Sequence, residues 1–112
     1  VFTPHLLPVN RGILATCYAR TRAELSDHAI ALAFESAYRD EPFVDFRREP
    51  FNPWLQNVVM TNRCAISFRF NAARRQLVVL SAIDNLVKGA AGQAIQNMNV
   101  MYGVPEQMGL DF

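Results

Sequence analysis

Three side chains near the two ends of this sequence have chemistry suited to a site that handles an anionic substrate. The first, His5, stands between Pro4 and Pro8, which hold the backbone extended on either side of it. A histidine fixed in this way is a candidate general acid or base, because its unperturbed pKa lies near neutrality. The alternative is an imidazole that is hydrogen-bonded to a loop carbonyl and has no chemical role.

The other two side chains are cations. Arg11 follows in a turn with Gly12 and is expected on the same side as His5, where its guanidinium suits a carboxylate or phosphate. Lys88 is the only lysine among 11 lysines and arginines, and it precedes Gly89 at the expected start of a helix. The alternatives are an ordinary surface arginine and a solvated lysine.

Lys88 belongs to a polar joint, residues 84–94, between a strand and a helix. The apolar, β-branched run 77–83 predicts a strand covered on both faces. The helix is expected from about Gly89 to Tyr102, with Gly103 as the left-handed residue at its end, because apolar residues recur at helical spacing: Ala90, Ala91, Ala94, Ile95, Met98, Met101 and Tyr102.

A helix start of this kind leaves backbone N–H groups and the positive end of the helix dipole facing outward. We therefore expect it to suit a phosphate, a carboxylate or an amide oxygen. In the alternative interpretation Asp84 or Asn85 caps the helix, and Gly89 and Gly92 only allow close packing.

The remaining pattern supplies the rest of a layered domain. We predict strands at 13–20, 43–47, 56–61, 64–70 and 76–83, the last two forming an antiparallel hairpin, and a helix at 27–39 capped by Ser26. These elements predict an α+β fold with a mostly antiparallel or mixed sheet and helices packed on one face. Because the sheet has apolar residues on both sides, we expect a homo-oligomer, dimer or tetramer, that covers the other face.

Composition agrees with a single domain spanning residues 1–112. The chain is 51% hydrophobic and 19% charged with a formal net charge of +1, which argues against a nucleic-acid surface. No apolar run approaches the roughly 18 residues that span a bilayer, so no membrane partner and a cytoplasmic location are expected. The chain begins without methionine, which suggests a fragment.

The two cysteines are predicted to be structural. Cys17 and Cys64 each fall inside a strand pattern and align with apolar neighbours, which favours buried, inert thiols over nucleophiles or a disulfide. The spacing of a zinc site is missing, so no metal is expected.

Two motifs about eighty residues apart resemble the N-acetyl-γ-glutamyl-phosphate reductase family of arginine biosynthesis. The first is Phe2-Thr3-Pro4-His5-Leu6 followed by Arg11-Gly12-Ile13; the second is Asp84-Asn85-Leu86-Val87-Lys88-Gly89-Ala90-Ala91-Gly92-Gln93-Ala94 with Gln96 and Asn97. The resemblance covers nearly the whole chain. It implies a substrate-binding and dimerisation region of the glyceraldehyde-3-phosphate dehydrogenase C-terminal type, preceded by a Rossmann domain that binds NADP.

The resemblance also implies roles for five residues. His5 matches the family's acid/base histidine, and Arg11 and Lys88 would bind the carboxylate or phosphate of an acyl-phosphate substrate. Asn85 and Gln93 would lie near the nicotinamide or the bound substrate. In the family's reaction a cysteine thiolate displaces phosphate from the acyl phosphate, and hydride from NADPH reduces the resulting thioester to a semialdehyde.

Two departures limit what this chain can do alone. It has no glycine-rich fingerprint after a first strand, and neither Cys17 nor Cys64 matches the family's nucleophile, which precedes the point where this chain begins. We therefore expect the isolated chain to be inactive. Two other functions stay open: a related acyl-phosphate reductase of lysine biosynthesis, and a non-catalytic oligomerisation module that keeps the fold.

Overall fold

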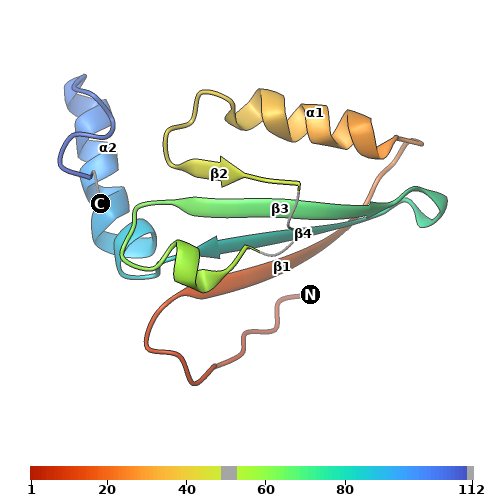
Figure 1. Ribbon diagram of the computed structural model, residues 1–112, viewed down its shortest axis with the longest axis horizontal. Helices are drawn as coiled ribbons and strands as arrows, with labels where there is room; N and C mark the ends of the chain where they lie inside the picture. The colour runs from red at the N-terminus through yellow and green to blue at the C-terminus, as the bar shows by residue number, and fades with distance from the viewer. Residues whose placement is uncertain (49–52, 111–112) are drawn as a thin grey trace.

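A four-stranded mixed sheet forms the centre of the computed structural model, which describes residues 1–48 and 53–110. The strands are β1 (Ile13–Arg20), β2 (Val44–Phe46), β3 (Cys64–Asn71) and β4 (Gln76–Ile83), in the order β1-β4-β3-β2 (Figure 1). β4 is antiparallel to both neighbours, and β2 is parallel to β3. The predicted α+β class, the hairpin and four of the five predicted strands are confirmed.

Helix α1 (Asp27–Tyr38) covers one face of this sheet. Ser26 caps it as predicted, with its hydroxyl accepting a hydrogen bond from the Ala29 N–H at 3.1 Å. Its Phe34 ring stacks on Phe46 and Phe68, with centroids 5.1 and 5.4 Å apart. Because side chains alternate along a strand, this contact shows that Cys64, Ile66, Phe68 and Phe70 face the helix.

The opposite face of the sheet is only partly covered. A 3₁₀ turn (Leu55–Asn57) lies against one end of it, where Val58 packs on Ala65 and Ala82. Edge strand β1 has little cover on either face: Ile13 and Leu14, which point to opposite sides, are 49% and 47% exposed. The prediction that Cys17 is buried is therefore wrong, because α1 does not extend over β1.

The predicted strand at 56–61 is also wrong. The segment turns instead of extending, and Met60 adopts a positive φ of 67°. Local bonds hold this turn, since Val59 N–H donates to Leu55 C=O at 2.9 Å and the Thr61 hydroxyl to Val58 C=O at 2.8 Å. Of residues 56–61, Val58 alone is buried in the core, and it anchors a loop there.

The helix predicted from Gly89 has two parts. A π-helical turn, η3 (Val87–Ala91), runs directly into α2 (Gly92–Tyr102), which ends at a left-handed Gly103 as predicted. Helix α2 stands at the end of the sheet rather than over its face (Figure 1), so the prediction that helices cover one face holds for α1 alone. Its apolar residues Met98, Met101 and Tyr102 are at least half exposed, whereas Asn99 is buried.

Candidate active site

Asp84 is the centre of a hydrogen-bonded cluster at the end of the sheet where β4 leads into η3. Its carboxylate is fully buried. Oδ1 accepts the N–H groups of Leu86 at 2.8 Å and Val87 at 3.1 Å, and Oδ2 accepts the N–H of Met60 at 2.6 Å. The first free amides of the helix start are thus already bonded to a carboxylate of this chain, as in the capping alternative.

Arg11 supplies the positive charge beside Asp84. Its Nη2 donates to Asp84 Oδ1 at 2.9 Å, and its Nε lies 2.8 Å from Oδ2 in an ion pair. Nη1 points to the sulfur of Met60 at 2.8 Å. The Arg11 side chain as a whole stays 23% exposed.

These contacts fix the charge of Asp84. Burial alone would raise the pKa of this carboxyl, but the hydrogen bond from Arg11 and those from the Met60, Leu86 and Val87 amides outweigh it. The pKa falls from 3.8 to about 2. Asp84 is therefore ionised at neutral pH, which suits a structural anchor better than a proton donor.

Asn85, the next residue, also joins the start of β1 to the end of β4. Its Oδ1 accepts the Gly12 N–H at 2.6 Å, which ties the start of β1 to the end of β4. Gly12 adopts a φ of 115°, and a Cβ there would lie 2.8 Å from Leu55 Cδ2. This turn therefore requires glycine, and it places Arg11 beside Asp84.

Lys88 lies close by but points into a second polar cluster. Its Nζ donates to Gln96 Oε1 at 2.6 Å and sits 5.4 Å from the centre of the Phe43 ring. The same oxygen accepts from Asn62 Nδ2 at 2.9 Å, and Gln96 Nε2 donates to the Glu106 carboxylate. The alternative of a solvated Lys88 is therefore wrong.

The surroundings of Lys88 act on its charge in opposite directions. Partial burial lowers the pKa of the ammonium, while Cys64, Glu106 and Glu41 favour its charged form; the net shift is downward. The ammonium has three N–H groups, and the described contacts use one of them. Lys88 thus keeps hydrogen-bonding capacity for an anion at this end of the sheet.

Gly92 allows the close approach on which this second cluster depends. A Cβ at this position would lie 2.3 Å from Asn62 Oδ1 and 2.9 Å from Val87 C=O. Asn62 is fully buried, and its Oδ1 has no hydrogen-bond partner among the described residues. Gly89 is less constrained, since its Cβ would meet Ile83 Cδ1 at 3.4 Å. Close packing is thus confirmed for Gly92.

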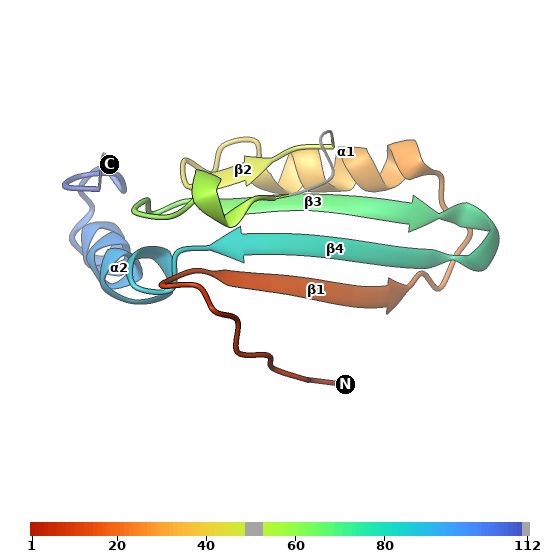
Figure 2. The same cartoon turned by 60° about the horizontal axis from the view of Figure 1, so that its bottom comes forward.

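His5 is not joined to these clusters by any contact among the described residues. Its Nδ1 lies 3.1 Å from the Thr3 carbonyl oxygen, the bond expected if the imidazole only contacts a loop carbonyl. The first residues form an exposed arm that leaves the sheet at the end where η3 and α2 begin (Figure 2). The arm therefore starts beside the Arg11 and Asp84 cluster, while the imidazole itself faces solvent.

Gln93 lies on the first turn of α2, and its Nε2 donates to Asn97 Oδ1 one turn later at 2.9 Å. The structure thus brings Arg11 and Asn85 together around Asp84, places Lys88 in the neighbouring cluster, and leaves His5 and Gln93 apart from both.

Met60, Asn62 and Glu106 were not predicted as site residues. Their segments show no periodicity or motif that would have identified them.

The described residues do not form a cradle for a dinucleotide. At the joint between β4 and η3, Asp84 takes the two amides that would otherwise meet a phosphate. A diphosphate there would face a buried negative charge.

No group of three His, Cys, Asp or Glu side chains within 1–48 and 53–110 has the geometry of a metal site.

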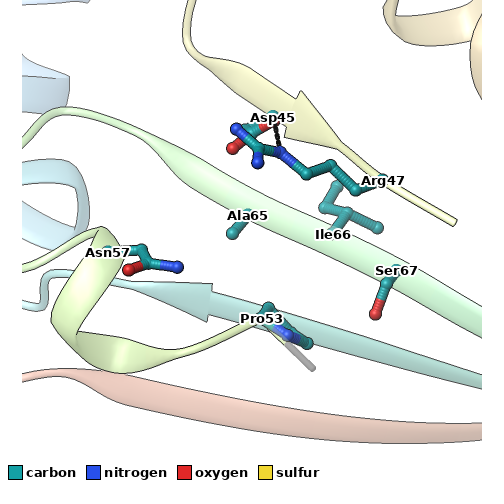
Figure 3. A pocket seen from close by; sticks show the side chains of 7 residues that line it. All are labelled: Asp45, Arg47, Pro53, Asn57, Ala65, Ile66 and Ser67. Carbon is teal, nitrogen blue, oxygen red and sulfur yellow. Dashed lines mark hydrogen bonds and ion pairs between the residues drawn. The ribbon is translucent and has the colours of Figure 1, made fainter. Parts of the chain in front are cut away.

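The pocket between β2, β3 and the 3₁₀ turn is also unsuited to a substrate. It has a volume of about 50 Å³, and its rim carries the exposed ion pair of Asp45 and Arg47 at 2.8 Å (Figure 3). Small-molecule sites usually occupy about 300–1,000 Å³, whereas this space suits a few waters.

No helix in the described part of the chain is long and apolar enough to cross a membrane.

Comparison with known proteins gives matches that agree in sequence and in fold. The sequence profile described as "Semialdehyde dehydrogenase, dimerisation domain" matches residues 1–85. Proteins called N-acetyl-gamma-glutamyl-phosphate reductase are similar over nearly the whole chain. The one from Halothermothrix orenii is 49% identical over 97% of this chain, and the one from Pelotomaculum thermopropionicum is 50% identical over 97%.

The chain spans about a third of these relatives, 31% of the length of both proteins. Among solved structures, aspartate semialdehyde dehydrogenase II from Vibrio cholerae superposes with a TM-score of 0.67 over 87% of this chain and 29% of that one. The sequence identity in that pair is 17%, so the comparison supports the fold alone.

Proposed function

Because the chain belongs to the semialdehyde dehydrogenase dimerisation-domain family, we propose that it is the substrate-binding and dimerisation part of a two-domain N-acetyl-γ-glutamyl-phosphate reductase. The single observation that carries this proposal is the identity of 48–50% with several reductases of that name over nearly all of this chain. The proposed reaction converts N-acetyl-γ-glutamyl phosphate to N-acetyl-glutamate semialdehyde and phosphate, in arginine biosynthesis.

The proposal divides the chemistry between this chain and the remaining two thirds of such a protein. The nucleophilic cysteine and the binding site for NADP are assigned to the part outside this chain, since the described residues offer no cradle for a dinucleotide. NADPH supplies hydride when bound there. Asn85 and Gln93 are proposed to contact its nicotinamide, because their side-chain amides lie at the end of the sheet where α2 begins.

Within this chain, His5 is proposed to move the proton. Its exposed imidazole has only a local bond to Thr3, so it is free to meet a thiol or an aldehyde oxygen supplied by another part of the protein. Arg11 and Lys88 are proposed to bind the carboxylate or phosphate of the substrate. The partial exposure of the Arg11 side chain and the remaining N–H groups of Lys88 support this role.

The proposed partner of this chain is a second copy. The family description names dimerisation, and the face of the sheet opposite α1 leaves Leu14 and Tyr18 47% and 73% exposed. Apolar side chains on an open sheet face are stabilised by a second layer. We therefore assign the dimer contact to this face.

Kinetics of the intact protein test the function. We expect NADPH-dependent reduction of N-acetyl-γ-glutamyl phosphate, with kcat/KM about ten-fold or more above that for an acyl phosphate one methylene longer. The isolated 112-residue chain serves as the inactive control. Preference for the longer substrate would favour the lysine-biosynthesis alternative, and absence of turnover with either would favour a non-catalytic oligomerisation module.

A further inference from the structure

The end of the sheet opposite Arg11 and Asp84 carries a concentration of arginine side chains. A shallow surface depression of about 600 Å³ lies there, lined by residues of β1, of β4 and of the turn that joins β3 to β4. Tyr18, Arg20, Arg74, Arg75 and Gln76 contribute to its lining. The eight residues of β1 separate this depression from the Asp84 cluster by about 25 Å.

No acidic side chain within these strands neutralises the arginines. The sequence contains no Asp or Glu between residues 13 and 23 or between residues 50 and 83. The ion pairs among the described residues involve Arg11, Arg47 and Arg48, and none involves Arg20, Arg74 or Arg75. The residues that line the depression therefore include three arginines and no acidic residue.

Backbone bonds hold the arginines of the turn in place. The Arg74 N–H donates to Asn71 Oδ1 at 3.1 Å, and the Arg75 C=O accepts the Thr21 N–H at 2.9 Å. Arg75 adopts a positive φ of 51°, a conformation that glycine or asparagine reaches at lower cost. The Arg75 side chain also ties the turn to the segment after β1, since its Nη1 donates to the Arg22 carbonyl oxygen at 3.3 Å.

We propose that this depression binds a small molecule carrying two or more phosphate groups. Guanidinium groups match phosphate oxygens in bidentate fashion, and three arginines contribute to the lining of this one depression. This inference does not depend on the proposed reductase function.

Tripolyphosphate is a suitable probe, tested on the intact protein by titration calorimetry and thermal melting at constant ionic strength. We expect it to bind and to raise Tm. The double variant Arg20→Gln/Arg74→Gln should bind more weakly, by up to about 25-fold, since each surface guanidinium contributes up to about five-fold. Arg39→Gln, an exposed arginine at the end of α1, is the matched control and should bind as the unmodified protein does.

Three results would overturn the proposal. The first is no binding of tripolyphosphate by the unmodified protein, and the second is unchanged affinity in the double variant. The third is a change in the mass of the assembly in the double variant, measured by sedimentation, which would assign these arginines to a contact between subunits instead.

Discussion

Arg11 and Asp84, 73 positions apart in the sequence, form a two-point ion pair that joins the start of β1 to the end of β4, with N···O distances of 2.8 and 2.9 Å. The carboxylate is fully buried and also accepts three backbone N–H groups. The segments that carry Arg11, Asn85 and Lys88 are attached to this pair directly or through Asn85, the neighbour of Asp84. The arm with His5 and the α2 residue Gln93 are not attached to it.

Replacing Asp84 should therefore destabilise the protein strongly. In Asp84→Asn the Arg11 charge loses its partner in a largely desolvated place, and we expect a loss of about 3 kcal/mol in the free energy of unfolding, measured by urea denaturation. Asp45→Asn is the matched control, because it removes a carboxylate from the exposed pair with Arg47. That change should cost less than about 1 kcal/mol. Equal effects of the two variants would contradict the role of the buried pair.

The same carboxylate predicts a pH dependence. The pKa of Asp84 is lowered in the folded state from 3.8 to about 2, so the unfolded chain takes up this proton first as the pH falls. The contribution of ionised Asp84 to stability is fully present above the pKa that this carboxyl has in the unfolded chain, and it is lost between about pH 4 and pH 2. The free energy of unfolding should fall more steeply across this window in the unmodified protein than in Asp84→Asn. Parallel curves would show that another group is responsible.

Gly92 and Gly89 offer a matched pair of substitutions. In Gly92→Ala the new Cβ meets Asn62 Oδ1 at 2.3 Å and the Val87 backbone, so we expect a loss of about 1–3 kcal/mol. In Gly89→Ala the closest contact is an ordinary 3.4 Å, and stability should change by less than about 1 kcal/mol. Thermal melting of both variants checks this difference, and a larger loss for Gly89→Ala would contradict the packing described.

Leu14 tests the proposed dimer face. Leu14→Asp places a charge on the open face of the sheet and should lower the mass of the assembly in analytical ultracentrifugation. Leu32→Asp is the control, since Leu32 on α1 is 49% exposed and Leu14 is 47% exposed. An unchanged mass in Leu14→Asp, or an equal loss in both variants, would remove the dimer contact from this face.

Local signals were enough to predict most of the elements. Alternating side chains predicted β1 and β3, and an apolar, β-branched run predicted β4. Ser26 marked the start of α1 because its hydroxyl acts within three residues. The same reasoning failed for residues 56–61. Only Val58 of this segment is buried, where it packs on Ala65 and Ala82. The apolar residues of the segment therefore reflect one tertiary contact and not a strand.

The site was predictable in its residue types but not in its contacts. The sequence identified Arg11 and Lys88 as cations and Asp84 as a possible cap, all from local chemistry. It did not indicate that Asp84 would bind Arg11, because this pair depends on how the start of β1 and the end of β4 meet. It also did not indicate that Lys88 would donate to Gln96, eight residues further along η3 and α2. The prediction that Cys17 is buried failed for a related reason, because no local sequence pattern indicates how far α1 extends across the sheet.

The most direct test of the proposed function is kcat of the intact protein with His5→Ala and with His28→Ala, its matched control. His28 is the other histidine of this chain and lies exposed on α1. We expect His5→Ala to lower kcat by roughly 10² to 10⁴, and His28→Ala to leave it unchanged. An unchanged kcat in His5→Ala would contradict the assignment of this imidazole to the chemistry.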